Sequence, residues 1–584
     1  MTSKSKIKMR MSVVKPYRFL QHRTTSEIGN PWLMEKFLYA RFHPEMVLLP
    51  NPSTEVGTSP RQTAGFLVAC LCRHGRQATY SSTSPRKRSA SVRGKMDNRN
   101  LSVLMITPEA APFARSGGLG DVAGALPAAL QSLGLQTSVI LPYYRCIRKS
   151  GIEAPVVARG LSIPLGSGTL EALVRKTVTP DGVEVYFLER EDLYDRPNLY
   201  NSAAGDYYDN LERFCFFCHG ALKAAVELDL HPDVIHCHDW QASPAAPLLA
   251  GPYRNNPGLN KSRCVFTIHN IGYQGTFPAD RFPVTGLSKK TFFHIEGLEY
   301  WGGVNLMKGG ILYSDIVTTV SPSYALEIQT PQFGMGLEGV LQRRSDSLTG
   351  ILNGVDYRTW NPAVDPLIPA NYSDSDIDGK IECKRRLMAS IGLESSLSRP
   401  VIGIVSRLDR QKGLDLVAEA AGSLIRLDTA LVILGTGDRE IQHRLERTAV
   451  ELPGRMSFTV GFDDELAHRI IAGSDILLVP SLYEPCGLTQ IYAMKYGTVP
   501  VVRAVGGLED TIMDVADFPG RGNGFKFKQH NPLSLVNAVR RAVEVFEQPG
   551  KWRKIVAAGM ALDFSWNKSA VSYTHLTLPT KRIV

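Results

Sequence analysis

The sequence contains no apolar run long enough to span a membrane. Its longest run near the N-terminus, residues 65–72, falls far short of the roughly 20 residues that a helix needs to cross a bilayer, and no later run reaches that length. The chain has 584 residues, 43% of them hydrophobic, which is enough for two or more domains with full cores. We therefore expect a globular protein with no membrane partner.

Acidic residues are scarce only near the N-terminus. The first 100 residues hold 18 Lys and Arg against 5 Asp and Glu, whereas the remaining 484 residues hold 48 against 51. The net charge of +10 therefore comes from the leading segment, and the body of the chain is almost neutral. Because a near-neutral body does not attract polyanions, we expect no nucleic-acid partner.

Both ends of the chain lack the pattern of a folded core. Residues 1–97 are rich in Ser, Arg and Lys and show neither helical nor strand periodicity. They are either an organelle transit peptide or upstream sequence outside the mature protein, with Met96 as the start. The second interpretation is favoured by four glutamates, which are unusual in transit peptides: Glu27, Glu35, Glu45 and Glu55. Near the C-terminus, a helix beginning at Ser565 is expected to end early, since residues 571–584 form an atypical tail that does not continue its pattern.

The nine cysteines have no framework spacing and are odd in number, which indicates a reducing compartment. Cys215 and Cys218 form a CxxC pair on an apolar helix-length segment. Without a second CxxC, core packing is favoured over a redox or metal pair. No other cluster has metal-ligand spacing, so we expect no metal and no cofactor.

Strand-length apolar runs alternate with helix-length segments in two series. The first series extends over residues 98–355 and the second over residues 399–570. Residues 356–398, rich in Pro, Asp and Asn, are expected to form a connector and hinge. The alternation predicts an α/β protein with two domains, each built on a doubly wound parallel sheet. Ligands bind beyond the carboxyl ends of parallel strands, and every motif below directly follows such a strand.

The most informative motif is at residues 480–502. A buried strand at 476–479 is followed by a loop with Glu484, a turn at 485–487, a helix at 488–496 and another buried strand at 499–502. The start of a helix directs free N–H groups toward an anion, such as a phosphate. Glu484 lies beside it, in position to bind the hydroxyls of a ribose or sugar. This loop therefore predicts a site for a nucleotide sugar.

A glycine-rich turn follows the strand at residues 101–107. Gly117, Gly118 and Gly120 allow the backbone to approach a ligand, with Arg115 at the mouth of the turn and Asp121 in the first turn of the next helix. The glycine spacing is a weak match to a dinucleotide fingerprint, because no acidic residue closes a second strand about 20 residues on. A nicotinamide-dependent oxidoreductase is therefore a distant alternative.

Histidines end two further predicted strands. In the stretch that begins at His236, a metal pair with His238, plain packing, and a sugar site formed by Asp239 and Trp240 are all possible, and the sugar site is favoured. His269 and Asn270 end the strand at 264–268 and are candidates for a functional role against a half-buried structural histidine. Neither a Ser nor a Cys occupies a nucleophile elbow, so a hydrolase triad is not supported.

Two cations follow the first strand of the second series. Arg407 and Lys412 flank a turn that opens a helix, and this pairing suits a departing diphosphate, whose charge must be neutralised. The alternative is that they are solvated loop residues.

Taken in order, the motifs resemble the bacterial glycogen synthase and plant starch synthase family. The quoted stretches are PEAAPFARSGGLGDV, HCHDWQ, TIHNIGYQG, GILNGVD, SRLDRQKGLD and PSLYEPCGLTQIYAMKYGTVPVVRAVGGLEDT, and the likeness covers roughly residues 98–570. The resemblance implies a GT-B fold, in which two Rossmann-like domains face a cleft. It also implies glucose transfer from ADP-glucose to the non-reducing end of an α-1,4-glucan, glycogen or starch, with retention of configuration. The location implied is cytoplasmic, as in bacteria, or plastid if the leader is a transit peptide.

The resemblance also implies roles for individual residues. The catalytic group would be His269, Arg407, Lys412 and Glu484. Donor or acceptor binding would involve Arg115, Gly117, Gly118, Asp121, Tyr208, Asp239, Asn270, Asn353, Phe462, Cys486, Gly487, Leu488 and Thr489. Phe462 would lie against adenine. Arg115 stands where the family usually has Lys, which changes reach and geometry.

No second acid follows Glu484 at the eighth position, where this chain has Tyr492. A covalent intermediate needs a carboxylate under the anomeric carbon, so a front-face route without metal is favoured. Tyr492 also argues against the nearest rival, a GT-B enzyme that uses UDP-sugars. A further alternative is an inactive glucan-binding scaffold, against which the intact His269, Arg407, Lys412 and Glu484 argue.

Overall fold

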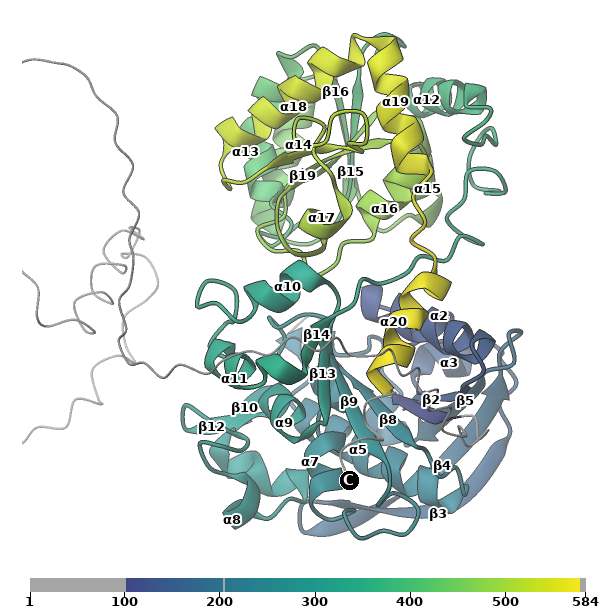
Figure 1. The fold of residues 1–584 in the computed structure, drawn as a ribbon, viewed down its shortest axis with the longest axis vertical. Coiled ribbons are helices and arrows are strands. Elements are labelled where there is room, and N and C mark those ends of the chain that lie inside the picture. Colours follow the sequence, from purple (N-terminus) through teal and green to yellow (C-terminus); the bar gives the residue numbers. More distant parts are fainter. Residues whose placement is uncertain (1–100, 203–204, 578–584) are drawn as a thin grey trace, which may run out of the picture. The chain divides into compact units, whose positions relative to one another are not determined.

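The computed structural model describes residues 101–202 and 205–577, with the side chain of Thr577 excepted. The predictions for residues 1–97 and 578–584 lie outside the described residues. Within the described ranges, every helix is too short or too polar to cross a bilayer. The chain there is organised around two large sheets (Figure 1). We refer to the parts built on them as the N-terminal half and the C-terminal half.

The N-terminal half contains a nine-stranded sheet. In spatial order its strands are β14 (Leu348–Gly350), β13 (Ile316–Thr319), β9 (Arg263–Ile268), β8 (Val234–His238), β1 (Ser102–Ile106), β2 (Gln136–Pro142), β5 (Glu184–Glu189), β4 (Gly168–Val178) and β3 (Val156–Leu165). Neighbouring strands from β14 to β5 are parallel. The order in which successive strands are added to the sheet reverses between β1 and β8, which is the topological switch point of this sheet.

The prediction of a wholly parallel N-terminal sheet is wrong at one edge. There β3 and β4 form an antiparallel hairpin that pairs with β5. β3 alternates between exposed and buried or half-buried positions over most of its length, and β4 has only two buried residues, Ala172 and Val174, as expected of strands with one solvated face. Their weak hydrophobicity explains why the apolar runs of the sequence did not reveal them.

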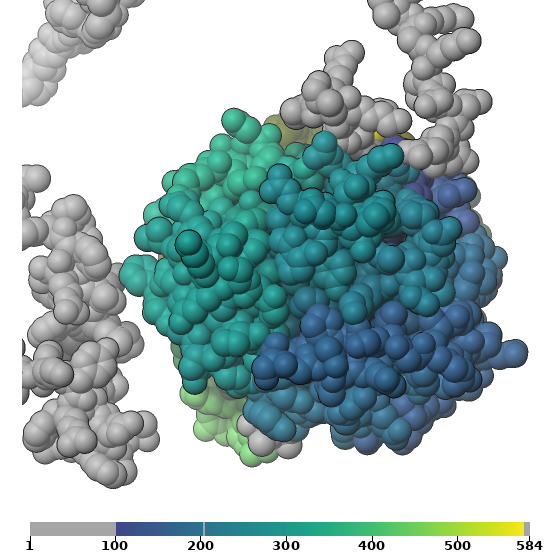
Figure 2. All heavy atoms as spheres, turned by 90° about the horizontal axis from the view of Figure 1, so that it is seen from below, coloured from purple at the N-terminus to yellow at the C-terminus, as the bar shows by residue number. Residues whose placement is uncertain are grey.

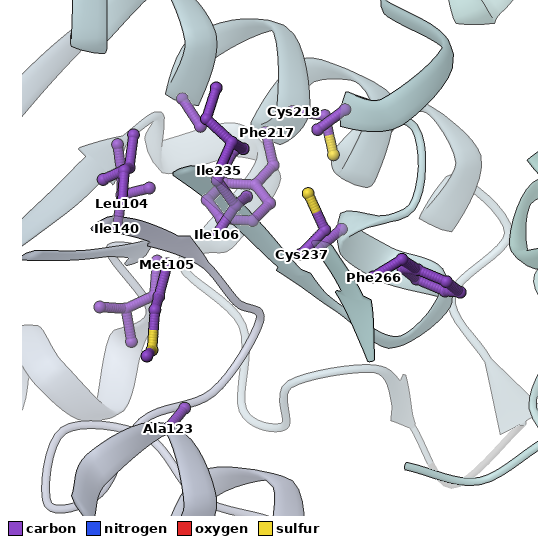
Figure 3. Packing of buried hydrophobic residues seen from close by; sticks show 14 of the residues in the cluster. Leu104, Met105, Ile106, Ala123, Ile140, Phe217, Cys218, Ile235, Cys237 and Phe266 are labelled. Carbon is purple, nitrogen blue, oxygen red and sulfur yellow. The ribbon is translucent and has the colours of Figure 1, made fainter. Parts of the chain in front are cut away.

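The core of this half lies between the central strands and the long helix α5 (Asn210–Glu227). Figure 3 shows Phe217 and Cys218 of α5 packed with Ile106, Ile235 and Cys237 of the neighbouring strands. Cys215 and Cys218 are fully buried and unpaired, so the prediction that this CxxC pair serves packing is confirmed. Residues of this half, coloured blue to teal, form most of the surface visible in Figure 2.

Helix α2 (Gly118–Ser132) begins directly in the glycine-rich turn, where the sequence predicts a helix. A small sheet of β10 (Thr276–Pro278), β12 (Gly303–Asn305) and β11 (Glu299–Tyr300) lies outside the main sheet and has no counterpart in the predictions. The remaining α-helices of this half with at least five residues are α3 (Arg145–Lys149), α7 (Ala245–Ala250), α9 (Leu306–Tyr313), α10 (Pro322–Glu327) and α11 (Glu338–Arg343).

The C-terminal half contains a six-stranded parallel sheet. Its spatial order is β17 (Met456–Val460), β16 (Ala430–Gly435), β15 (Val401–Val405), β18 (Ile476–Val479), β19 (Val499–Arg503) and β20 (Phe525–Phe527). This is the 3-2-1-4-5-6 order of a Rossmann fold, whose switch point lies between β15 and β18. The helices around it are α13 (Leu414–Ile425), α14 (Arg439–Glu451), α15 (Asp464–Gly473), α16 (Thr489–Lys495), α17 (Gly506–Thr511), α18 (Pro532–Phe546) and α19 (Pro549–Met560).

Two elements extend beyond the expected segments. The predicted connector contains α12 (Asp378–Ser390), which packs against α15. The last helix, α20 (Trp566–Thr577), returns to α2, as the yellow and purple ribbons show (Figure 1). The expectation that this helix ends early is therefore wrong as far as Thr577. Trp566, Ala570 and Tyr573 are buried at helical spacing, and this burial supports the continued helix.

Candidate active site

A cavity of about 1140 Å³ is lined by residues from both halves. From the N-terminal half come the segments that follow β1, β8 and β9, and from the C-terminal half those that follow β15 and β18. These are the carboxyl ends of strands at or beside the two switch points, where ligands of doubly wound sheets bind. All predicted site residues except Tyr208 line this cavity.

The loops after β15 and β18 hold each other in place. The N–H of Leu482 donates to the carbonyl of Gln411 over 2.7 Å. Gly413 has a φ of 70°, and a Cβ at this position would lie 2.3 Å from the carbonyl oxygen of Pro480. Only glycine permits both the conformation and the approach. The residues carried by the two loops are therefore fixed relative to one another.

Lys412 and Glu484 form an ion pair across these loops. Nζ of Lys412 lies 2.6 Å from Oε2 of Glu484, and Oγ of Ser481 donates to the same oxygen over 2.9 Å. Glu484 is 5% exposed, so this pair is largely removed from water. Oε1 of Glu484 accepts no hydrogen bond from the described residues. The carboxylate therefore has one oxygen bound by the protein and one available to a ligand.

Arg407 lies at the cavity wall, further toward solvent. Its guanidinium donates to the hydroxyl of Tyr273, in the N-terminal half, over 3.3 Å. Burial disfavours its charge, but the Tyr273 hydroxyl and the carboxylates of Asp409 and Glu484 outweigh that effect and raise the pKa of Arg407. The guanidinium remains a full positive charge beside Lys412.

Residues 486–489 form the remaining C-terminal wall. Leu488 is the N-cap residue of α16, and Gly487 has a φ of 68°, where a Cβ would lie 2.5 Å from Oε1 of Gln490. Burial raises the pKa of the Cys486 thiol to about 12, although the backbone N–H of Asn353 favours the thiolate. Cys486 is therefore a neutral packing group between the two halves.

In the N-terminal half, the glycine-rich turn is anchored by Glu109, directly after β1. Its carboxylate accepts from Ser116 N over 2.5 Å and from Ser116 Oγ over 2.6 Å, and from the hydroxyl of Tyr200 over 2.5 Å. Gly117 has open space where a Cβ would be, whereas a Cβ at Gly124 would lie 2.5 Å from the carbonyl oxygen of Ala111. The first glycine faces the cavity, and the second permits close packing of the helix.

Asp239 fixes the backbone that carries His269 and Asn270. Its Oδ1 accepts from His269 N over 2.7 Å, and the N–H of Asn270 also donates to this carboxyl. Asp239 adopts a φ of 55°, a left-handed conformation in which its side chain turns back toward the neighbouring strand end. Burial raises the pKa of Asp239 to about 8, against the two backbone N–H groups that favour the ionised form.

Three buried histidines form a row behind the cavity wall. The rings of His236 and His238 lie 4.1 Å apart, and Nδ1 of His238 is 3.0 Å from Nε2 of His269. Burial lowers the pKa of His236 and of His269 to about 3, and that of His238 well below its usual value. All three are therefore neutral near pH 7, and His269 faces the cavity as an uncharged imidazole.

The tautomers of His238 and His269 follow from the surroundings of one buried atom, Nε2 of His238. Nε2 of His238 is buried and has no hydrogen-bond partner in the described chain. A bare lone pair is cheaper to leave unpaired there than an N–H, so the proton of His238 lies on Nδ1 and is donated to Nε2 of His269. The proton of His269 then lies on its own Nδ1, the nitrogen left to donate to a ligand.

With this geometry established, comparisons with known proteins can be interpreted. Residues 102–343 match the family model described as the starch synthase catalytic domain, and residues 392–556 match that of the glycosyl transferases group 1. The glycogen synthase of Syntrophotalea carbinolica is 42% identical over 82% of this chain and 98% of its own. Glycogen synthase 2 of Geobacter sulfurreducens is 44% identical, with the same coverage.

The chain belongs to the starch and glycogen synthase family. It is a glycosyltransferase of glycogen or starch synthesis, as the motifs predict. The catalytic domain of starch synthase IV from Arabidopsis thaliana, solved with ADP and acarbose, superposes with a TM-score of 0.77 at 34% identity, covering 82% of this chain and 99% of that one. The predicted GT-B fold is confirmed. A sucrose-phosphate synthase from Thermosynechococcus elongatus, 18% identical with a TM-score of 0.51 over 83% of this chain and all of that one, shares the fold alone.

Two aromatic residues expected in this family's donor site differ in placement. Phe462 is 82% exposed and lines the cavity, with its ring available to a flat ligand. Tyr208 is 86% exposed and does not line the cavity. Its expected role in donor or acceptor binding stays a prediction without support from the geometry.

Several cavity residues escaped the sequence-based reasoning. Glu109 could have been found as an acid directly after a buried strand, whereas Tyr273 has no local signal. Trp360 is sandwiched between Tyr492, at 4.0 Å and 4°, and His468, at 3.8 Å and 14°. Through this stack the connector contributes Trp360 to the cavity wall, beside Tyr492, the eighth residue after Glu484. Among the described residues, no three His, Cys, Asp or Glu side chains gather as metal ligands.

Proposed function

We propose that this protein transfers glucose from ADP-glucose to the non-reducing end of an α-1,4-glucan, with retention of configuration. The observation that carries the proposal is a single cavity with a charged wall, formed by Arg407 and the Lys412–Glu484 pair, and a neutral wall, formed by His269 and Asn270. A nucleotide sugar has the same polarity, with an anionic diphosphate joined to an uncharged sugar.

The diphosphate would lie against Arg407 and Lys412. The two cations at the cavity wall, of which Lys412 is the more buried, would neutralise the charge that grows on the leaving oxygen as the bond to the phosphate breaks. Arg115, Gly117 and Gly118 also line this cavity, and Gly117 has open space where a Cβ would be. Phe462 would stack on adenine at the rim, beside residues 486–489, which we assign to the phosphate end.

The transferred glucose would lie between Glu484 and the neutral wall. Oε1 of Glu484 can accept from sugar hydroxyls, and Nδ1–H of His269 can donate to one. Asn270 is oriented by its own turn, since its Oδ1 accepts from Gly272 N over 2.9 Å. Oδ1 of Asn353 is enclosed without a hydrogen-bond partner among the described residues, and Asn353 also lines the cavity. Asp239 would act by holding His269 and Asn270.

We favour a front-face reaction. The hydroxyl of the acceptor attacks the anomeric carbon from the side on which ADP departs, and its proton passes to the departing phosphate oxygen. The C–O bond to the phosphate breaks and a new glycosidic bond forms on the same face. Because Oε2 of Glu484 is held by Lys412 and Ser481, this carboxylate suits a binding role better than that of a nucleophile. A trapped glycosyl-enzyme adduct would contradict this route.

The test is glucose transfer to a glycogen primer by the chain beginning at Met96, with ADP-glucose and UDP-glucose compared side by side. We expect transfer with a preference for ADP-glucose. Activity with UDP-glucose alone would assign the protein to another GT-B specificity. A folded protein that binds glucan but transfers from neither donor would support an inactive scaffold instead.

A further inference from the structure

The turn between β11 and β12 has an unusual residue at its tip. Tyr300 pairs with Gly303, so Trp301 and Gly302 form a two-residue hairpin turn. Both have positive φ, 51° and 78°, as in a type I′ turn. That turn favours Asn-Gly, because a left-handed conformation is disfavoured for residues with bulky side chains. A tryptophan at this position therefore lowers the stability of the hairpin relative to asparagine.

Packing of the Trp301 side chain does not compensate for this loss of hairpin stability. It is 88% exposed, whereas the other four tryptophans of the described ranges are buried or half-buried. Its ring contact is with Tyr300, in a T-shaped arrangement with centroids 6.3 Å apart, and the high exposure of the indole leaves at least one of its faces open to solvent. A residue that strains a turn and buries little is better explained by binding than by folding.

Hydrogen bonds connect this hairpin to the rim of the cavity. Gln274 accepts from Asn305 Nδ2 over 2.7 Å and donates to the carbonyl of Met335 over 3.0 Å. The hydroxyl of Tyr300 donates to the same carbonyl over 3.3 Å. Tyr273, the neighbour of Gln274, lines the cavity and accepts from Arg407. The hairpin and the cavity rim thus belong to one rigid surface of the N-terminal half.

We propose that Trp301 is a glucan-binding subsite outside the cavity, which holds the acceptor chain at a distance from its reacting end. This inference rests on the proposed function. The C–H faces of a glucose ring are apolar and its edge carries hydroxyls, so such a ring stacks on an open indole. A protein partner is not expected here, because one indole ring beside the carboxylate of Glu299 forms too small and too polar a surface for a protein interface. That carboxylate accepts from Gly302 N.

Trp301→Asn separates binding from folding. Asparagine is favoured at this turn position, so we expect the variant to unfold at the same or a higher temperature than the wild type. In native gels containing glycogen, we expect its apparent Kd for the glucan to rise about fivefold or more. Trp301→Tyr, which keeps a ring, should retain most of the retardation. Leu533→Ala removes another exposed apolar side chain, on α18, and should migrate like the wild type.

Kinetics give the second readout. We expect Trp301→Asn to raise KM for glycogen while kcat and KM for ADP-glucose stay within twofold, roughly the scatter of a neutral surface change. KM for maltose should not change, because a disaccharide in the cavity would not reach the hairpin. Equal glycogen retardation and equal KM for wild type and Trp301→Asn would overturn the inference, as would a wild type that glycogen does not retard.

The two proposals fail in distinguishable ways. Trp301-dependent retardation in a protein that transfers no glucose would overturn the proposed function and leave the glucan subsite standing. Normal transfer from ADP-glucose, with retardation independent of Trp301, would overturn the subsite alone.

Discussion

The two walls of the cavity differ in charge: the neutral wall lies on the N-terminal side and the charged wall on the C-terminal side. On the N-terminal side, His269 and the two histidines behind it lie at strand ends, where burial lowers their pKa and keeps them neutral. On the C-terminal side, Arg407 and Lys412 lie in a loop between β15 and α13, where Lys412 pairs with Glu484 and the guanidinium of Arg407 lies 3.5 Å from the carboxylate of Asp409. The same fold thus provides a neutral and a charged surface according to how deeply each loop is buried.

The comparison suggests that the two walls have different roles. The C-terminal wall would bind the diphosphate and stabilise its charge, and the N-terminal wall would orient the hydroxyls of the sugar. Substitutions on the two walls should therefore differ in kind. Changes on the charged wall should alter kcat most, whereas those on the neutral wall should act through geometry.

The largest effect is expected for Lys412→Gln. Loss of the cation removes charge stabilisation from the leaving group and leaves Glu484 buried without its partner, so we expect kcat to fall about 10²- to 10³-fold. Steady-state kinetics with glycogen and ADP-glucose measure this. Arg410→Gln, an exposed neighbour that does not line the cavity, is the matched control and should be nearly silent. A fall in kcat of less than about fivefold for Lys412→Gln would show that Lys412 does not stabilise the leaving group.

On the neutral wall, His238→Ala should lower kcat/KM about 10- to 100-fold although His238 touches no substrate, because His269 loses the hydrogen bond that orients its ring. His238→Gln, whose side-chain amide can still donate, should recover part of the activity. Thermal unfolding of both variants separates this effect from simple destabilisation. Unchanged kcat/KM in folded His238→Ala would show that the row of histidines does not position His269.

The neutral wall should also make the protein sensitive to acid. His236 has a folded-state pKa of about 3, below its usual value of roughly 6.5, so the unfolded chain takes up its proton first as the pH falls. The folding stability contributed by neutral His236 is fully present above about pH 6.5. By pH 5 about 2 kcal/mol of that stability has been lost. Asp239, with a raised pKa of about 8, acts in the opposite direction.

The contribution of His236 to this acid sensitivity is measured by comparing a His236 variant with the wild type at two pH values. Urea unfolding at pH 7 and pH 5 should show a smaller loss of stability for His236→Asn than for the wild type. Identical losses would mean that His236 does not remain neutral in the folded protein.

A smaller effect is expected for Phe462→Ala. The ring is 82% exposed, so its removal should leave the unfolding temperature unchanged, while KM for ADP-glucose rises about tenfold through lost stacking. Phe462→Trp should preserve the low KM. A change in kcat without a change in KM would contradict an adenine-binding role.

The smallest effect is expected for Arg115→Lys, which introduces the residue usual in this family. Arg115 lies 3.1 Å from Asp121 and 4.0 Å from Asp464, and both pairs are partly exposed. Such pairs contribute at most about 1 kcal/mol each, so KM for ADP-glucose should change less than about fivefold. A larger change would show that the guanidinium fork itself binds the donor.

The local pattern of the chain was sufficient for the strands that form the centre of each sheet. β1, β9, β16, β18 and β19 appear where strand-length apolar runs occur, because strands covered on both faces must be apolar throughout. The hairpin of β3 and β4 was missed because one face is solvated and its residues are mixed. The site residues directly after strands were found for the same reason as the strands.

Residues that reach the site by long-range packing could not be predicted. Tyr273 meets Arg407 from 134 positions away in the sequence, and Trp360 enters the wall by stacking between His468 and Tyr492. In each case the local sequence offers no period or turn chemistry that indicates the contact. The continuation of α20 to Thr577 depends in the same way on burial against the N-terminal half.

The sequence by itself determined the two α/β series, the glycine positions where backbones approach closely, and the family to which the chain belongs. Only the tertiary structure decided which charges persist, since the neutrality of His269 depends on burial behind the strand ends. It also decided that Lys412 meets Glu484 across 72 positions of the sequence. The reason is physical: side-chain type is local, whereas solvation and pairing depend on all the segments that surround a group.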